Sequence, residues 1–220
     1  MTELIYFNDQ EILQAKAQVK NIIIEKNALI TDRTPFYPKG GGQLSDVGII
    51  KNNAFHCQVI NVCKENDMIY HIIANSTGEI NVNDNVDMIV DSKVRNLHSR
   101  LHSAGHIIDI ALFSLEFSKN VTVTRACHYP KESSVSYLGK LVYTKEDTLR
   151  MIQEKCDELI NEDIKIEILH EENNMRYTFI KGYKIACGGT HVKSSKEIGK
   201  LILKKIVLKK EEFRISYDVE

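Results

Sequence analysis

The sequence has no apolar run long enough to span a bilayer, and its first ten residues, MTELIYFNDQ, lack a basic stretch followed by an apolar core. We therefore expect a cytoplasmic protein that does not bind membranes. It has five cysteines, an odd number, and no C-x-x-C pair. In a reducing compartment, scattered cysteines of this kind are free thiols or metal ligands, and they do not indicate a disulfide framework.

The chain also has almost no net charge, because 29 Lys and Arg face 30 Asp and Glu, but the charges are unevenly distributed. Residues 1–90 hold seven basic and eleven acidic residues, whereas residues 176–210 hold ten basic residues and one acidic residue. Two interpretations of this basic segment stay open. It is either a solvated lysine face on edge strands, where lysine hinders edge-to-edge pairing, or a surface that binds phosphate groups.

The first ninety residues contain short β-rich runs that are separated by polar turns. These runs are VKNIIIEKNALITD, VGIIKNNAFHCQVINVCK with a hairpin turn at Asn52-Asn53, MIYHIIANS and VDMIVD. Several short strands of this kind predict a small antiparallel barrel or sandwich. Between the first two runs lies TPFYPKGGGQLSDVG, which holds two of the three prolines and three consecutive glycines. We expect it to form a structured loop.

The hydrophobic period changes at Asp91-Ser92. Residues 92–117 place apolar side chains at helical spacing, and Ser92 is the expected N-cap. Gly105 is the one poor helix former within this segment. A glycine there costs about 1 kcal/mol relative to alanine, so we expect it to serve close packing or close approach of a ligand.

A second helix is expected over residues 145–161, with Thr144 and Asp147 as a capping box. Strands are expected over residues 164–169 and, as a terminal hairpin, over residues 199–219. The predicted fold class is therefore α+β. An antiparallel β-barrel-like domain occupies residues 1–91, and an α+β domain of an antiparallel sheet with helices occupies residues 92–220.

Two short motifs carry the chemistry. In HSAGH, His102 and His106 are four residues apart on the long helix, so both imidazoles project from one face. In CGGTH, Cys187 and His191 are also four apart, and the glycines let the backbone turn so that both side chains point inward. Three imidazoles and one thiolate form a tetrahedral set that suits zinc. Either pair alone would be a weak signal, but together they predict a zinc site.

The other histidines give weaker signals. His98 lies one turn before His102 and could be a partner of a ligand, a substrate contact or a solvated side chain. The remaining four have no matching partner in the sequence, and we assign them no role: His56, His71, His128 and His170. Position 103 is serine, so the glutamate of the zinc-protease motif H-E-x-x-H is missing, which argues against a peptidase.

The motifs HSAGH and CGGTH, preceded by DRTPFYPKGGGQLSDVG, closely resemble the editing domain of alanyl-tRNA synthetases and, above all, the free-standing AlaX trans-editing proteins. The resemblance runs over essentially the whole chain. Because the chain has the glycine-rich N-terminal part and no synthetase catalytic domain, it is most similar to the medium-length form of that family. Leu44, where proline is common, and Gly105, where bulkier residues often occur, depart mildly from the pattern.

The resemblance implies a zinc-dependent hydrolase that deacylates tRNA(Ala) mischarged with serine, and in some members with glycine. It implies that His102, His106, Cys187 and His191 are the zinc ligands, and that Gly40, Gly41, Gly42 and Gln43 form a loop against the catalytic pocket. Thr34 matches a position suited to sense the substrate hydroxyl. The general base stays open among Gln43, Asp46 and the ribose hydroxyl of the substrate.

The basic segment, with Lys193, Lys200 and Lys204, would contact tRNA phosphates. We expect no obligate protein partner. The alternative from another functional class is a non-catalytic, zinc-stabilised module that only binds tRNA.

Overall fold

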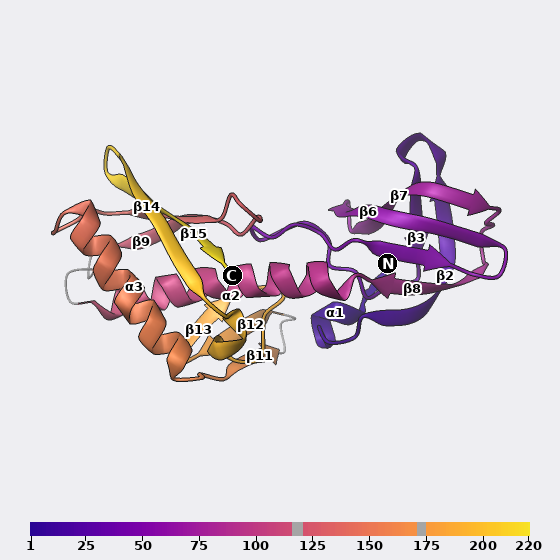
Figure 1. Ribbon diagram of the computed structural model, residues 1–220. Helices are drawn as coiled ribbons and strands as arrows, with labels where there is room; N and C mark the ends of the chain where they lie inside the picture. Colours follow the sequence, from indigo (N-terminus) through magenta and orange to yellow (C-terminus); the bar gives the residue numbers. More distant parts are fainter. Residues whose placement is uncertain (116–120, 171–174) are drawn as a thin grey trace. The chain divides into compact units, whose positions relative to one another are not determined.

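The computed structural model describes residues 1–115, 121–170 and 175–220, and the chain divides into two compact units (Figure 1). The first unit comprises Met1–Gly40 and Leu44–Asn96, and the second comprises Gly41–Gln43 and Leu97–Glu220. Most of the described elements are strands, and helices are few. None of the described helices combines the length and apolar character that a membrane-spanning segment needs. A boundary at residue 91 between two separate domains stays a prediction.

The first unit is a closed barrel of six strands in which all neighbours are antiparallel. In barrel order the strands are β2 (Gln14–Ile23), β3 (Ala28–Thr31), β7 (Met68–Gly78), β6 (Phe55–Glu65), β5 (Gly48–Lys51) and β8 (Asn85–Val90). Side chains alternate between the barrel interior and solvent, so that Phe55, Cys57 and Val59 of β6 are buried and the residues between them are exposed. The predicted barrel-like architecture is confirmed for this part of the chain.

Short elements complete the first unit. A 3₁₀ turn, η1 (Ile24–Lys26), connects β2 to β3, and the β5–β6 hairpin turns at Asn52, as the sequence predicts. The two-residue strands β1 (Glu3–Leu4) and β4 (Arg33–Thr34) pair in parallel, and a single helical turn, α1 (Ile5–Asn8), follows β1.

The second unit packs two antiparallel sheets and two main helices around one apolar core. A four-stranded sheet has the order β14-β15-β10-β9, and a three-stranded sheet has the order β11-β12-β13. The elements of this unit are β9 (Thr122–Cys127), β10 (Ser134–Leu138), α3 (Lys145–Asn161), β11 (Ile166–His170), β12 (Arg176–Ile180), β13 (Tyr183–Ala186), η3 (Ser195–Ile198), β14 (Leu201–Lys209) and β15 (Glu212–Val219). The terminal hairpin, drawn in yellow in Figure 1, is the predicted one.

The long helix, α2, runs from Ser92 to Ser114, close to the predicted range, of which residues 116 and 117 lie outside the described residues. Its predicted N-cap is wrong by one position. The Asp91 carboxylate accepts hydrogen bonds from the backbone N–H groups of Lys93 (2.9 Å) and Val94 (3.1 Å), so Asp91 is the cap. Ser92 is the first residue within the helix, because a carboxylate one position earlier already satisfies the free N–H groups.

The cap of α3 is at Thr144, as predicted, since its hydroxyl oxygen accepts from the backbone N–H of Asp147. The reciprocal half of the capping box differs from the expectation. The Asp147 carboxylate accepts from the Thr144 hydroxyl at 2.8 Å, and not from the backbone of the cap residue.

Candidate metal centre

Four side chains of the second unit converge on one point. His102 and His106 project from α2, and Cys187 and His191 come from the loop that follows β13. Their four candidate ligand atoms all lie within 4.8 Å of one another, and the three histidines are buried. The structure therefore brings HSAGH and CGGTH together into a cluster that could hold a metal ion.

Two distances within the cluster match those of a tetrahedral metal site. The Cys187 Sγ atom lies 3.3 Å from Nε2 of His102 and 3.3 Å from Nε2 of His191. Bond lengths of about 2.0–2.1 Å to nitrogen and about 2.3 Å to sulfur place the ligand atoms of a tetrahedral zinc site about 3.5 Å apart. A small tetrahedral ion thus fits the donor set.

His106 gives an independent indication of a missing ligand. Both of its ring nitrogens are buried, and neither has a hydrogen-bond partner among the described residues. The closest carboxylate oxygen, Oδ2 of Asp109, lies 3.9 Å from Nδ1, which is too long for a hydrogen bond. Unsatisfied buried polar atoms destabilise a fold by about 1–3 kcal/mol each, and a metal at Nε2 would remove one of these penalties.

The electrostatics of the cluster favour the ligand form of cysteine. Burial raises the pKa of the Cys187 thiol, but the adjacent His191 and His102 outweigh burial, and the net pKa is well below its ordinary value. Burial lowers the pKa of His102, and it lowers that of His191 to about 3, so both imidazoles are neutral at pH 7. At His106 burial lowers the pKa, but the nearby Asp109 and Cys187 outweigh burial and raise the pKa to about 9. A thiolate with neutral imidazoles is the ionisation state that binds metals, so a metal would displace a proton from His106.

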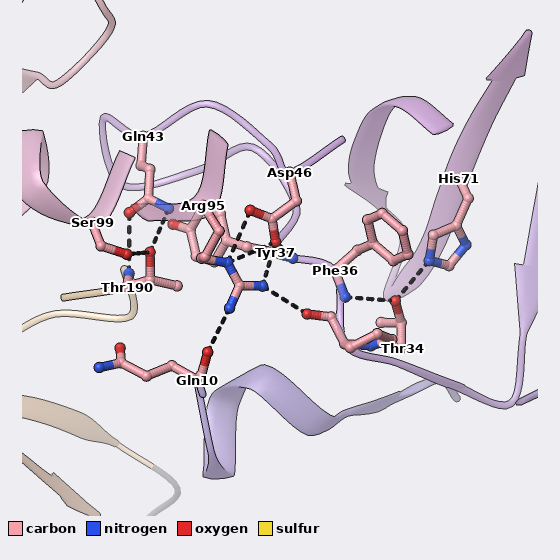
Figure 2. Close-up of polar contacts among 11 residues, drawn as sticks. Gln10, Thr34, Phe36, Tyr37, Gln43, Asp46, His71, Arg95, Ser99 and Thr190 are labelled. Atoms are coloured by element: carbon pink, nitrogen blue, oxygen red, sulfur yellow. Dashed lines mark hydrogen bonds and ion pairs between the residues drawn. The ribbon is translucent and has the colours of Figure 1, made fainter. Parts of the chain in front are cut away.

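Gln43, from the glycine-rich loop, orients His102. Its Oε1 accepts from His102 Nδ1 (2.8 Å) and from the backbone N–H of Thr190 (3.1 Å), while its Nε2 donates to the Thr190 hydroxyl (2.9 Å). The Thr190 hydroxyl also bonds the Ser99 hydroxyl at 2.7 Å (Figure 2). Because an amide oxygen only accepts, the His102 proton resides on Nδ1 and leaves Nε2 free to bind a metal.

Ser103 supports His191 in a similar way. Its Oγ atom lies 3.3 Å from His191 Nδ1 and accepts from the backbone N–H of Val192 at 3.2 Å. Ser103 occupies the position that holds the catalytic glutamate in a zinc protease, and here it contacts the candidate ligand His191 and the backbone of the next residue.

The two glycines of CGGTH have different surroundings. A Cβ atom added to Gly189 would lie 2.1 Å from His102 Cε1, whereas one added to Gly188 would meet nothing within 4 Å. The Gly189 carbonyl accepts from Arg176 Nη1, and the Arg176 carbonyl accepts from the Cys187 N–H at 3.1 Å. Arg176 therefore braces the loop from β12, and Gly189 lets the loop approach the imidazole.

His128, to which the sequence assigned no role, lies directly against the cluster. Its ring stacks on His102 with centroids 4.3 Å apart, and its Nδ1 lies 2.5 Å from the Tyr217 hydroxyl. That hydroxyl also bonds the Leu101 carbonyl at 3.0 Å, so it must donate there and accept from His128. A Cβ added to Gly105 would lie 2.4 Å from His128 Cε1, which explains the helical glycine by close packing.

No short-range pattern could have identified His128, because it stacks on a residue 26 positions earlier in a different element. His71 was also assigned no role, because its contacts are with residues far away in the sequence. It is buried in the first unit, where its Nδ1 donates to the Leu29 carbonyl at 3.0 Å and its Nε2 contacts Thr34 Oγ1 at 2.8 Å.

The glycine-rich loop adopts backbone conformations that favour glycine. Gly41 and Gly42 have φ values of 53° and 76°, and a Cβ on Gly42 would lie 2.6 Å from the Ala126 carbonyl oxygen. The Gly42 carbonyl accepts from the His128 N–H at 2.7 Å. These contacts place Gly41, Gly42 and Gln43 in the second unit together with the cluster, whereas Gly40 belongs to the first.

Thr34 and Asp46 belong to the first unit. The Thr34 hydroxyl donates to His71 and accepts from the Phe36 N–H at 3.1 Å (Figure 2). The fully buried Asp46 carboxylate accepts from Arg95 Nε at 2.9 Å and from the Tyr37 N–H at 2.6 Å.

Arg95 completes this network with two carbonyls of the same unit. Its Nη1 donates to Gln10 (2.7 Å) and its Nη2 to Pro35 (2.8 Å), in addition to the ion pair with Asp46 (Figure 2). The network ties down both ends of the segment that carries FYPKGGGQ.

The three lysines expected to bind tRNA are all exposed. Lys200 pairs with Glu220 at 3.0 Å, and Lys204 pairs with Asp218 at 2.6 Å. The backbone N–H of Lys193 donates to Glu197. Lys204 lies on β14, which is an edge strand of the four-stranded sheet. Its position therefore also agrees with the other interpretation of the basic segment, in which lysines on edge strands hinder edge-to-edge pairing.

Comparison with known proteins gives a consistent result. A family model described as tRNA synthetases class II (A) matches residues 3–94. The chain is 32% identical to the alanyl-tRNA editing protein AlaX-M of Saccharolobus solfataricus, over the full length of both, and 30% identical to AlaX-M of Pyrococcus horikoshii, over 90% of this chain and 88% of that one. It is 29% identical to an alanine–tRNA ligase of Saccharolobus islandicus over 90% of this chain, but it spans about a quarter (24%) of that enzyme.

Proposed function

Because the chain belongs to the AlaX-M family of alanyl-tRNA editing proteins, we propose that it is a trans-editing hydrolase that acts on mischarged tRNA(Ala), chiefly by removing serine. The observation that carries this proposal is the His102, His106, Cys187 and His191 cluster, with Gln43 of the glycine-rich loop bound to one of its histidines. The scissile bond is the ester between the amino acid and the terminal ribose.

We further propose that the ion in the cluster is zinc. Three imidazoles and one thiolate are a typical zinc donor set, and thiolate is a poor ligand for magnesium or calcium. When bound there, zinc would have one of two roles: a Lewis acid toward the ester carbonyl, or an ion that holds the pocket in shape while all its positions are taken by the protein. An aminoacyl ester is already activated, so this help does not require a covalent intermediate.

The protein's own residues would prepare the site in three ways. Gln43 and Ser103 hold the Nδ1 atoms of His102 and His191, which directs both Nε2 atoms toward Cys187. His128 stacks on His102 and restrains its ring plane. Such supporting contacts typically change metal affinity by about 10–100-fold.

We propose a structural role for Asp46 and a substrate contact for Thr34. Because Arg95 and Tyr37 already bind the Asp46 carboxylate, we assign Asp46 to holding the glycine-rich segment. Gln43 and the ribose hydroxyl of the substrate are then the remaining candidates to assist proton transfer. The Thr34 hydroxyl uses its one proton on His71, so a substrate hydroxyl would have to donate to its remaining lone pair.

Editing has a physical rationale in this system. A synthetase pocket shaped for alanine rejects serine only by about 10²-fold, because an apolar pocket cannot strongly exclude an added hydroxyl. A second site that hydrogen-bonds the serine hydroxyl can discriminate in the other direction, since alanine leaves that site's polar groups unpaired.

The decisive experiment is turnover of Ser-tRNA(Ala) by the purified protein, before and after treatment with a chelator and after zinc is restored. We expect deacylation that the chelator abolishes and zinc restores, with Ala-tRNA(Ala) hydrolysed far more slowly. A folded, zinc-loaded protein that binds tRNA without hydrolysing Ser-tRNA(Ala) would instead support the non-catalytic binding module.

A further inference from the structure

The four-stranded sheet of the second unit buries only one of its faces. Along β10 and β15, Val135, Tyr137, Phe213 and Ile215 point into the core and are fully buried or nearly so. The residues between them point to the opposite face, because successive side chains of a strand alternate. This outward face is therefore available to a partner.

The strand register aligns polar and basic side chains across that face. One row runs Lys205, Ser216, Ser134, Cys127 over β14, β15, β10 and β9. The next row runs Val207, Arg214, Ser136, Arg125. Serines occupy three of the four positions on the two central strands, and the fourth is Arg214. Lys205 and Arg125 stand at the two edges, so the face is hollowed over the serines.

This hollow, which we name the sheet groove, has a volume of about 570 Å³. It continues into a second hollow of about 310 Å³, which shares Arg125, Ser136 and Arg214 with it and extends toward Lys209. Five cationic side chains line the larger part against a single acidic one, Glu132: they are Arg125, Lys131, Lys204, Lys205 and Arg214.

Three of the five cations of the sheet groove have no carboxylate partner among the described residues. Arg125, Lys205 and Arg214 form no ion pair with any residue that the structure describes, whereas Lys200 and Lys204 have carboxylate partners. Unpaired cations that gather in a concave surface produce a positive potential, which attracts a polyanion.

We propose that the sheet groove binds the sugar–phosphate backbone of tRNA close to its aminoacylated end. Guanidinium, ammonium and hydroxyl groups are the usual donors to phosphate oxygens, and the groove presents all three. Arg125 and Arg214 both oppose Ser136 from neighbouring strands, which separates them by about 10 Å, two strand spacings. They can therefore contact different phosphates of one strand.

The groove lacks what base recognition would need. Its one aromatic lining residue, Tyr217, is 1% exposed and points its hydroxyl toward His128 in the core, so it cannot stack on a base. We therefore expect backbone contacts that position the RNA and carry little sequence preference.

The groove and the candidate metal centre belong to the same unit, and adjacent residues connect them. Cys127 lies at its β9 side, and the next residue, His128, stacks on His102. This inference rests on the proposed editing function in taking the bound RNA to be tRNA, but its test does not require hydrolysis.

The test measures binding of uncharged tRNA(Ala), labelled at its 3′ end, as a function of salt. We expect Arg125→Gln, Lys205→Gln and Arg214→Gln each to weaken binding by about 3–10-fold near 0.1 M salt. Each should also reduce the slope of log K against log salt by about one. Lys145→Gln is the matched control, since it removes an exposed lysine of the same unit that lies outside the groove.

A second pair of variants probes the floor of the groove. Ser136→Glu adds a negative charge there, while Ser136→Gln adds a side chain of the same size without the charge. A loss of binding of at least 10-fold for the glutamate variant relative to the glutamine variant is expected. Circular dichroism and zinc content of each variant confirm that the fold and the cluster are intact.

The outcomes separate this inference from the proposed function. Wild-type binding that the groove variants leave unchanged, in affinity and in salt slope, overturns the inference even if Ser-tRNA(Ala) is hydrolysed. Reduced binding by the groove variants supports it even if no hydrolysis is found. Failure of the wild-type protein to bind tRNA(Ala) at low salt also overturns it.

Discussion

The side-chain oxygen of Gln43 accepts a hydrogen bond from Nδ1 of His102 at 2.8 Å, which links the glycine-rich loop to the candidate metal centre. The same oxygen accepts from the Thr190 N–H. The Gln43 amide therefore orients the candidate ligand His102 and also the loop that carries Cys187 and His191. Gln43→Ala should reduce zinc affinity by about 10–100-fold, because His102 loses the group that fixes its tautomer and ring orientation. Competition with a fluorescent chelator measures this directly. Gln43→Glu keeps an acceptor and should lose less affinity; equal losses in the two variants would contradict the assigned role.

Cys187→Ala should abolish both zinc binding and deacylation, because it removes the thiolate from the cluster. Lys204→Ala, by contrast, should only weaken tRNA binding, and the effect should shrink as salt rises. Zinc content and single-turnover rates at saturating protein distinguish the two. Cys63→Ser, on the barrel, is the matched cysteine control. Loss of the maximal rate to the same extent in the Cys187 and Lys204 variants would contradict both assignments.

The neighbouring glycines of CGGTH provide a matched pair. Gly189→Ala places a methyl group 2.1 Å from the His102 ring, so the loop or the imidazole must move, and we expect zinc binding to weaken by at least 10-fold. Gly188→Ala meets no atom within 4 Å and should bind zinc within about 2-fold of wild type. Isothermal titration of the two variants tests the geometry of the turn. The inverse result would show that the loop has a different conformation.

Asp46→Asn should act on stability. It leaves Arg95 buried without a full negative partner, and breaking such a pair costs about 3–5 kcal/mol of unfolding free energy. Urea denaturation provides the measurement. Glu3→Gln, which breaks an exposed pair with Arg33, should cost less than about 1 kcal/mol. If Asp46→Asn instead kept its stability and lost the chemical step, Asp46 would be the general base.

His71 should make the protein less stable in mild acid. Burial lowers its pKa to about 4, while the unfolded chain has a histidine pKa near 6.5. Between these values the unfolded state binds the extra proton, so this contribution to stability is complete above pH 6.5 and declines by about 3 kcal/mol as the pH falls to 4.

Replacing His71 by glutamine should therefore flatten the dependence of unfolding free energy on pH over that window. The same replacement at the exposed His56 serves as the control for the substitution itself. An unaltered slope in the His71 variant would mean that this imidazole is not held neutral in the folded protein.

Much of the fold could be predicted from local patterns. Alternation along β6 and the Asn52 turn are properties of adjacent residues, as is the helical spacing within α2, and the structure has all three. The N-cap of α2 was misplaced because Asp91 and Ser92 are both good caps, and only the backbone geometry selects between them. The β9 and β10 strands, of six and five residues, were not predicted from the sequence.

For the candidate site, the sequence by itself determined the donor set. Residues four apart on a helix lie on one face, and the glycines of CGGTH let its backbone turn, so each motif supplies two donors that can point the same way. Only the tertiary structure decided what supports that cluster. His128, Gln43 and Ser103 contact its ligands across separations of 26, 59 and 88 residues. Contacts at such distances depend on how whole elements pack, and no periodicity in the sequence encodes them.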